Sequence, residues 1–300
     1  MNAGVCAFDD ETDAGRRLAR ALDARFSPVV VHRFPDGETM PKVSAPAAET
    51  TIVYRSLDRP NLKLVDLLLA ADAWRRAGAK RLILVAPYLC YLRQDAVFEP
   101  GEPLSRDVIA PLLGARFDAV VTVAPHLHRT ADLSAALGAP AFNVAAADAL
   151  GPGLPEYVEA PLVVGPDSES AGWARAWALK LGGQALTLEK RRLGDRRVEV
   201  TYPVPGRVEG KEVLLIDDVA STGQTLVAAI RFLRGAGASS IDVAVVHALF
   251  TPRAAERLQA AGARRIMSTD SVRHPTNAVE LAPWLAAAVR RAIAVRTSKA

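Results

Sequence analysis

The chain has 300 residues, half of them hydrophobic, so it can bury a large core, and its length predicts two domains. Its 37 basic and 33 acidic residues leave a net charge of +4, which suits anionic substrates but is too small to indicate nucleic-acid binding. Two cysteines are too few for a disulfide framework or a zinc cluster, and the lack of a signal peptide or a long apolar run predicts a soluble cytoplasmic protein without membrane contact.

The first half of the chain alternates helix-type and strand-type patterns. Residues 62–77 have the pattern of an amphipathic helix, and Gly78 is expected to end it. Strands are predicted at residues 81–86 and 119–123. The glycine- and proline-rich residues 151–155 break this rhythm and predict a turn between two domains.

The alternation starts again after this turn, and its later elements are strands at 162–164, 213–216 and 241–246 and an alanine-rich helix at 281–295. Alternating strands and helices predict a mostly parallel sheet with helices on both faces. We therefore predict domains at residues 1–150 and 151–300, in two halves of similar rhythm that suggest a duplication. The last helix can pack on either domain.

The most informative stretch follows the predicted strand at 213–216. Asp217 and Asp218 end its apolar run, and a small-residue loop then leads into a helix. In a parallel sheet this loop lies at the carboxyl edge, where such folds bind ligands. The positive end of the new helix suits a phosphate, as do the loop residues Ser221, Thr222, Gly223 and Thr225. The stretch predicts a sugar-phosphate site; the simpler alternative is a solvated turn in which Ser221 or Thr222 caps the helix.

Further polar clusters lie just past or beside predicted strand ends. Each alone is compatible with an ordinary surface loop, but their co-occurrence is hard to attribute to chance. They occupy residues 34–38, 87–95, 124–128, 164–167 and 189–192.

Together these segments resemble the phosphoribosyl diphosphate (PRPP) synthetase family, also called ribose-phosphate pyrophosphokinase. The resemblance runs in order from about residue 30 to beyond 280. It includes Phe-Pro-Asp-Gly-Glu38, Pro-Tyr-x-x-Tyr-x-Arg-Gln-Asp95, His-Ala-Leu-Phe250 and the loop after Asp218. Gly-Pro-Asp-Ser-Glu-Ser170 and Glu-Lys-Arg-Arg192 are most similar to the compact archaeal-type branch.

The resemblance implies an α/β fold of two tandem type I phosphoribosyltransferase-like domains, each a mostly parallel sheet flanked by helices. It implies transfer of the β,γ-diphosphoryl group of ATP to the C1 hydroxyl of ribose 5-phosphate, giving PRPP and AMP. Mg²⁺ is the implied cofactor. In the family the loop at 34–38 reaches the nucleotide of a neighbouring subunit, so a homo-oligomer of at least two chains is expected.

The resemblance also implies a role for each matched residue. Lys190 and Arg192 correspond to the family's catalytic pair, and His126 and Asp167 to residues at the magnesium-bound phosphates. The expected ATP-binding residues are Phe34, Asp36, Glu38, Arg93, Gln94 and Asp95. Those expected to bind ribose 5-phosphate are Asp217, Asp218, Ser221, Thr222, Gly223, Gln224 and Thr225.

Three positions depart from the family pattern. Gln224 stands where glycine is usual, Ala96 replaces a basic residue, and Ala124 replaces an acidic one. Such changes leave open the diphosphoryl donor, the sugar and the regulation. Two alternatives also stay open at this point: a PRPP-using phosphoribosyltransferase, and a non-catalytic regulatory subunit that resembles PRPP synthetase.

Overall fold

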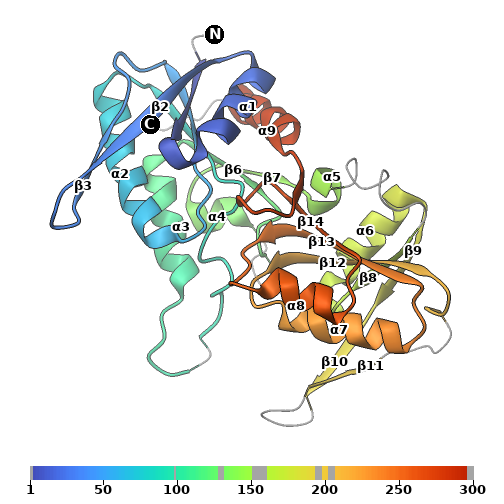
Figure 1. Cartoon of the computed structure of the whole chain (residues 1–300). Helices are drawn as coiled ribbons and strands as arrows, with labels where there is room; N and C mark the ends of the chain where they lie inside the picture. The colour runs from blue at the N-terminus through green and yellow to red at the C-terminus, as the bar shows by residue number, and fades with distance from the viewer. Residues whose placement is uncertain are drawn as a thin grey trace. The chain divides into compact units, whose positions relative to one another are not determined.

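The computed structural model describes residues 3–97, 99–127, 132–150, 161–192, 198–201 and 207–295, with the backbone alone at 190–192 and 198–201. The chain forms two compact units (Figure 1). The first comprises Met1–Val144 together with Leu281–Ala300, and the second comprises Ala145–Glu280. The assignment of nucleotide binding to residues 1–150 and of sugar-phosphate binding to residues 151–300 stays a prediction.

A mixed sheet forms the centre of the first unit. Its described strands run in the order β3-β2-β1-β4-β5-β6-β7, and all neighbours are parallel except the hairpin β2–β3. The predicted strands at 81–86 and 119–123 are confirmed as β5 and β6. The bounds are β1 Ala3–Phe8, β2 Arg25–Arg33, β3 Thr39–Lys42, β4 Thr50–Tyr54, β5 Arg81–Val85, β6 Ala119–Val123 and β7 Ala141–Val144.

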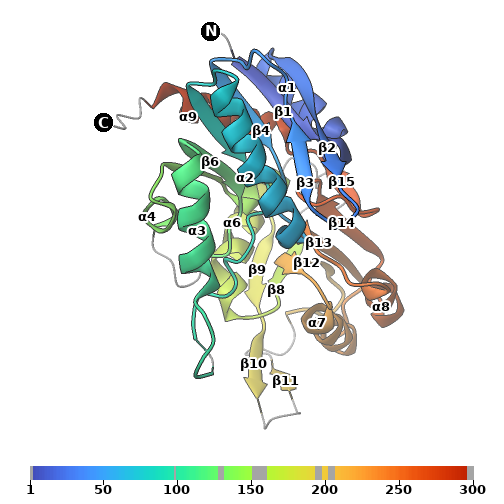
Figure 2. The same cartoon turned by 90° about the vertical axis from the view of Figure 1, so that its left-hand side faces the viewer.

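Helices cover both faces of this sheet (Figure 2). On one face α2, α3 and α4 bury apolar side chains, and Leu67, Ala70 and Trp74 of α2 share the spacing of one helical face. On the other face α1 packs against α9. The bounds are α1 Thr12–Leu22, α2 Pro60–Arg76, α3 Ser105–Arg116, α4 Leu133–Leu137 and α9 Ala282–Ala294.

The last helix, whose partner the sequence left open, belongs to the first unit. It contacts α1 and the strands β5, β6 and β7. The guanidinium of Arg81 donates hydrogen bonds to the carbonyl oxygens of Ala292 (2.6 Å) and Ile293 (2.9 Å), near the end of α9. A cation at a helix C-terminus satisfies carbonyl groups that have no partner within the helix.

The second unit has a parallel sheet in the order β15-β14-β13-β12-β8-β9 among its described residues. A separate antiparallel pair, β10 and β11, follows β9 in the chain. The bounds are β8 Leu162–Gly165, β9 Gln184–Thr187, β10 Glu189–Arg192, β11 Val198–Thr201, β12 Glu212–Ala220, β13 Ser240–Ala248, β14 Arg265–Thr269 and β15 Asn277–Val279. The fold class predicted from the sequence, two α/β domains with mostly parallel sheets, is confirmed.

Helices flank this second sheet too. The apolar side chains of α7 and α8 form one core with the strands, whereas α5 and α6 pack on other parts of the sheet. The bounds are α5 Ala146–Leu150, α6 Ala171–Leu181, α7 Gln224–Gly235 and α8 Ala254–Ala261. None of the helices in the described ranges of the chain combines the length and the apolar character needed to cross a bilayer.

Strand order reverses once in each unit. In the second unit the chain passes from β8 to β9 on one side and later places β12 on the other side of β8. In the first unit β4 likewise lies on the side of β1 opposite to β2. In open α/β sheets ligands bind at such reversal points, beyond the carboxyl ends of the strands. The β8/β12 and β1/β4 ends are therefore the places to look for sites.

Replacing Gly114 of α3 with alanine is expected to lower the free energy of unfolding by about 2–3 kcal/mol, as overpacked sites do. A Cβ there would lie 1.7 Å from the carbonyl oxygen of Leu137, at the end of α4. Gly172→Ala in α6 is the matched control, because no described atom lies within 4 Å of its Cβ. That change is expected to stabilise by about 0.5–1 kcal/mol. Urea denaturation of both variants measures the difference.

Candidate active site

The acid pair of the second unit lies within a strand. β12 runs on through Asp217 and Asp218 to Ala220, beyond the predicted end at residue 216, because it stays paired with β13 as far as Ala248. Asp218 is 8% exposed and Asp217 is half-buried. The pair therefore occupies the carboxyl end of β12, beside β8, at the reversal point of the sheet (Figure 1).

Three carboxylates influence one another at this point. Burial, followed by the charge of Asp218 and then a hydrogen bond that protonated Asp217 donates to it, raises the pKa of Asp217 well above its ordinary value, and the charge of Asp167 adds to the shift. The backbone N–H of Asp218 donates to Asp217 Oδ1 (3.0 Å), and that of Val219 donates to Asp218 Oδ1 (2.7 Å). Asp167, two residues after β8, also accepts from the N–H of Ser170 (3.2 Å) and so caps a short 3₁₀ turn. Three carboxylates are therefore gathered at the carboxyl end of this sheet.

The loop after β12 enters α7 through a glycine. Gly223 has φ 72°, a left-handed conformation that glycine adopts without strain, and it is the N-cap of α7. No side chain caps this helix, so the alternative in which Ser221 or Thr222 serves as the N-cap is wrong. Gln224, the first residue of α7, is exposed.

The carbonyl groups of this loop are held from the β13–α8 side. The N–H of Thr251 donates to the carbonyl of Ser221 (3.1 Å), and Arg257 of α8 donates to that of Thr222 (3.0 Å). Arg257 also contacts Thr251 Oγ1 (3.4 Å). Fixing the carbonyl groups on one side favours N–H groups that face an anion on the other. The sequence analysis missed Arg257, whose only sequence signal is its position a few residues after His-Ala-Leu-Phe250.

In the first unit, the predicted nucleotide residues 34–38 form the tip of the β2–β3 hairpin. Phe34, Asp36 and Glu38 are all exposed there. The tip closes on itself through Phe34 N–H to the Glu38 carbonyl (2.9 Å) and Gly37 N–H to the Phe34 carbonyl (3.0 Å). The ring of Phe34 meets that of His32 edge-on at 4.5 Å. An exposed aromatic ring with two carboxylates beside it can contact a base and its ribose.

The second predicted nucleotide segment follows β5. Its backbone turns sharply at Tyr91, where φ is 62°. Arg93 is exposed, Gln94 accepts a hydrogen bond from the hydroxyl of Ser105 at the start of α3, and Asp95 is 8% exposed. The three residues therefore lie at different depths, with Arg93 outermost.

His126 follows β6 in the first unit and is half-buried. Two residues before it Ala124 has φ 38°, a conformation that strains a non-glycine residue and that occurs most often at functional sites. His128, in the same motif, lies outside the described residues. Because His126 belongs to the first unit and Asp167 to the second, their joint action at one metal ion stays a prediction.

Lys190 and Arg192 lie in β10, paired with Val200 and Val198 of β11. Their side chains lie outside the described residues, so their predicted catalytic role rests on the sequence.

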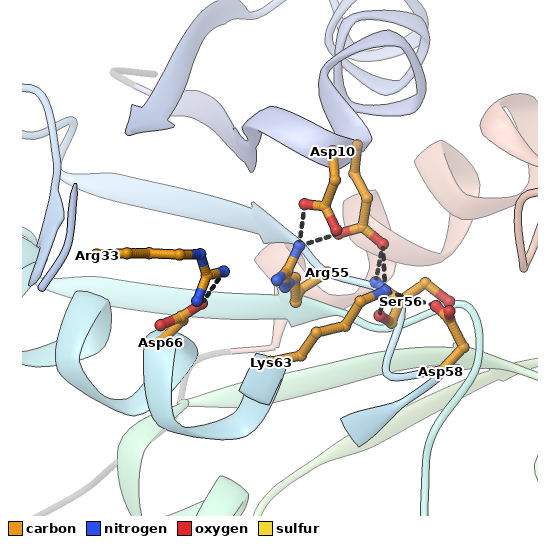
Figure 3. A network of polar contacts seen from close by, with 8 residues as sticks. Asp10, Arg33, Arg55, Ser56, Asp58, Lys63 and Asp66 are labelled. Atoms are coloured by element: carbon orange, nitrogen blue, oxygen red, sulfur yellow. Dashed lines mark hydrogen bonds and ion pairs between the residues drawn. The ribbon is translucent and has the colours of Figure 1, made fainter. Parts of the chain in front are cut away.

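The reversal point of the first unit carries a partly buried network of ion pairs that the sequence motifs did not reveal (Figure 3). Arg55, 3% exposed and just after β4, pairs with Asp10 and with Glu11 (3.1 Å) beyond β1, and its guanidinium stacks 4.2 Å above the ring of Phe8. Lys63 of α2 extends the network to Asp58 (2.5 Å). The position in the first sheet that corresponds to the acid pair of the second sheet thus holds ion pairs between the first unit's own side chains. Asp9-Asp10-Glu11 after one strand and Arg55 after another were the available sequence signals.

The donor chemistry of the second unit suits Mg²⁺. Asp167 offers carboxylate oxygens, the ligands that this ion prefers, and a divalent cation beside it would offset its repulsion with Asp217 and Asp218. Within the described ranges, no group of three or more His, Cys, Asp and Glu side chains is arranged to hold a metal.

Comparison with known proteins identifies the family. Residues 5–116 match the N-terminal domain of ribose phosphate pyrophosphokinase, and residues 156–281 match the phosphoribosyl transferase domain. Ribose-phosphate pyrophosphokinases of Methanopyrus kandleri (strain AV19) and Thermococcus kodakarensis (strain KOD1) are 41% and 34% identical; each alignment covers 95% of this chain and 98% of the relative. The crystal structure of phosphoribosylpyrophosphate synthetase from Mycobacterium smegmatis superposes with a TM-score of 0.84 at 28% identity, over 98% of this chain and 99% of that one. The chain belongs to the ribose-phosphate pyrophosphokinase family, as its motifs predict.

Proposed function

We propose that this chain is a ribose-phosphate diphosphokinase, which transfers the β,γ-diphosphoryl group of ATP to the C1 hydroxyl of ribose 5-phosphate and releases PRPP and AMP. The observation that carries the proposal is the segment from Asp217 to Thr225: an acid pair with Asp218 buried, and a glycine turn at a helix N-terminus, at the reversal point of the second sheet. Family membership supports the same reaction. A PRPP-using phosphoribosyltransferase is disfavoured, because residues 5–116 match the N-terminal domain of the pyrophosphokinase.

In this proposal ribose 5-phosphate binds along that segment. The carboxylates of Asp217 and Asp218 accept hydrogen bonds from the ribose hydroxyls. The 5-phosphate lies at the turn, against Ser221, Thr222, Gly223, Gln224 and Thr225 and the positive end of α7. The C1 hydroxyl is then held in a defined orientation, which an in-line transfer requires.

ATP is bound by residues of the first unit. Phe34, Asp36 and Glu38 contact the base and ribose, and Arg93, Gln94 and Asp95 complete the nucleotide site. We propose that the tip at 34–38 serves the site of a neighbouring copy, so the working enzyme is a homo-oligomer with at least two chains. The same proposal places the enzyme in the cytoplasm, with ATP and ribose 5-phosphate as its partners and no role for nucleic acid or membrane.

Charge neutralisation drives the chemical step in this proposal. Mg²⁺, when bound beside His126 and Asp167, neutralises phosphate charge. Lys190 and Arg192 contact the diphosphoryl group as it leaves AMP, and they stabilise the negative charge that develops on its oxygens. Contacts of this kind, made to charge that grows in the transition state, raise the turnover number most strongly.

Phosphorus NMR of a mixture of the protein, ATP, Mg²⁺ and ribose 5-phosphate tests this function. We expect AMP and PRPP in equal amounts. ADP as the nucleotide product would mean simple kinase chemistry and would overturn the proposal. No turnover, with ribose 5-phosphate still bound in a titration, would favour the regulatory-subunit alternative. Omission of Mg²⁺ is expected to abolish product formation.

Arg257→Ala is expected to raise KM for ribose 5-phosphate about tenfold, with KM for ATP unchanged. The substitution removes a charged donor to the carbonyl of Thr222, a hydrogen bond of a kind that contributes about 1.5 kcal/mol. Arg231→Ala, which removes the same charge from the exposed side of α7, is the control and is expected to leave both constants unchanged. Equal KM values for ribose 5-phosphate in Arg257→Ala and wild type would show that Arg257 does not shape the loop.

A further inference from the structure

Asp66 of α2 contacts the residue on each side of the loop at 34–38. Arg33 is the last residue of β2 and Thr39 the first of β3, and the two are paired across the hairpin. The hydroxyl of Thr39 donates to Asp66 Oδ1 (2.6 Å). On the other side of the loop, Nη2 of Arg33 lies 3.6 Å from Asp66 Oδ2, and Figure 3 shows this ion pair. One carboxylate therefore closes the base of the tip that carries Phe34, Asp36 and Glu38.

The burial of Asp66 makes this contact informative. Asp66 is 1% exposed, and its Oδ2 accepts no hydrogen bond within the described part of the chain, although the arginine charge is near. A buried carboxylate with few partners is destabilising relative to an apolar residue of similar size. The next residue on the same helix, Leu67, is part of the buried hydrophobic core, so an apolar side chain is the kind that packs well here. A carboxylate at 66 is thus unfavourable for packing, and its contacts are directed at the hairpin.

The tip itself is exposed. Its three predicted nucleotide-binding residues are accessible, and the hydrogen bonds among its described residues, including Glu38 N–H to Asp36 Oδ1 (3.1 Å), join tip residues to one another. The hairpin runs alongside α2 (Figure 2), so its orientation depends on contacts to that helix. The Asp66 carboxylate supplies one of these contacts, at the base of the tip.

The same helix also holds the second predicted nucleotide segment. The hydroxyl of Tyr91 donates to Asn61 Oδ1 (2.5 Å), and Tyr91 precedes Arg93 by two residues. Asn61 and Asp66 are five positions apart, which is about 7.5 Å along a helix axis. One rigid helix therefore sets the positions of both segments.

We propose that Asp66 is a positioning residue for ATP binding, acting through Thr39 and Arg33 on the tip at 34–38. This inference rests on the proposed function, because it takes the tip to be part of a nucleotide site. Asp66 touches no substrate itself. Its loss would leave the tip attached but free to sample orientations in which Phe34 no longer meets the base.

The test is a double-mutant cycle of Thr39→Val and Asp66→Leu, with steady-state constants and hydrogen–deuterium exchange as readouts. Each single variant is expected to raise KM for ATP at least fivefold, with KM for ribose 5-phosphate unchanged. The double variant is expected to have the same KM for ATP as Asp66→Leu alone, because that substitution already removes the contact with Thr39. Amides of residues 33–39 are expected to exchange faster in all three variants. Thr39→Ser keeps the hydroxyl and is expected to restore wild-type values.

Asp72→Leu is the matched control, because Asp72 lies on the exposed side of the same helix and pairs with Arg76. It is expected to change neither readout. Additive effects of the two variants, or equal rises in both KM values, would overturn the positioning role and leave Asp66 as a structural residue. Hydrogen–deuterium exchange distinguishes a failure of this inference from a failure of the proposed function. If wild type makes no AMP, faster exchange of amides 33–39 in the variants still supports the contact between Asp66 and the hairpin, and unchanged exchange refutes it.

Discussion

Replacing Lys190 with alanine is expected to lower kcat at least 100-fold while both substrates still bind. The reason is that the ammonium group is proposed to contact charge that develops only as the diphosphoryl group moves. Removing one such contact commonly costs about 3 kcal/mol of transition-state stabilisation. Single-turnover measurement of AMP formation gives the effect on the chemical step, and titration with a non-hydrolysable ATP analogue reports binding. Arg192→Ala is expected to behave in the same way.

Arg191→Ala is the matched control for this result. Arg191 lies between Lys190 and Arg192 in sequence and is not one of the two residues that correspond to the family's catalytic pair. It removes the same charge from the same strand, β10. An unchanged turnover number in Lys190→Ala, or an equal loss in Arg191→Ala, would contradict the catalytic assignment.

Asp218→Asn is expected to lower kcat/KM for ribose 5-phosphate about 100-fold, with little change in KM for ATP. Asp218 is nearly buried at the end of β12, and one of its oxygens is engaged by the N–H of Val219. An amide in its place presents a donor where a ribose hydroxyl needs an acceptor, and an unmatched polar group in a closed site costs about 2–3 kcal/mol. Calorimetric titration with ribose 5-phosphate measures the loss of affinity directly.

Asp242→Asn separates a loss of binding from a loss of folding. Asp242 is a fully buried aspartate on the neighbouring strand β13, where it accepts hydrogen bonds from Arg264 (2.7 Å) and Arg265 (2.6 Å). Its substitution is expected to lower the unfolding temperature and to leave kcat/KM unchanged. If both variants lose affinity and stability together, Asp218 is a structural residue and the ribose assignment fails.

The family and its reaction could be predicted because the residues that carry them are close in sequence. The run through Asp217 and Asp218 to Thr225 combines a strand pattern, two carboxylates and a glycine before a helix, and each of these reports local backbone geometry. The strands β5 and β6 were predicted for the same reason, since apolar runs of their length are typical of buried parallel strands. Which side chains touch substrate stays a prediction for every site residue.

Sequence by itself therefore determined the class of fold, the alternation of elements and the loop proposed to bind a sugar phosphate, because these depend on local periodicity and turn chemistry. Only the tertiary structure decided the contacts between distant segments. Examples are the packing of α9 in the first unit, the hydrogen bond from Arg257 to the loop after β12 and the hydrogen bond between Thr39 of the hairpin and Asp66. Arg55 illustrates the reason. In the sequence it resembles an ordinary surface cation, and only the pairing of β1 with β4 places it beside Asp10 and Glu11. Burial and partner choice depend on which elements become neighbours, and no local pattern records that.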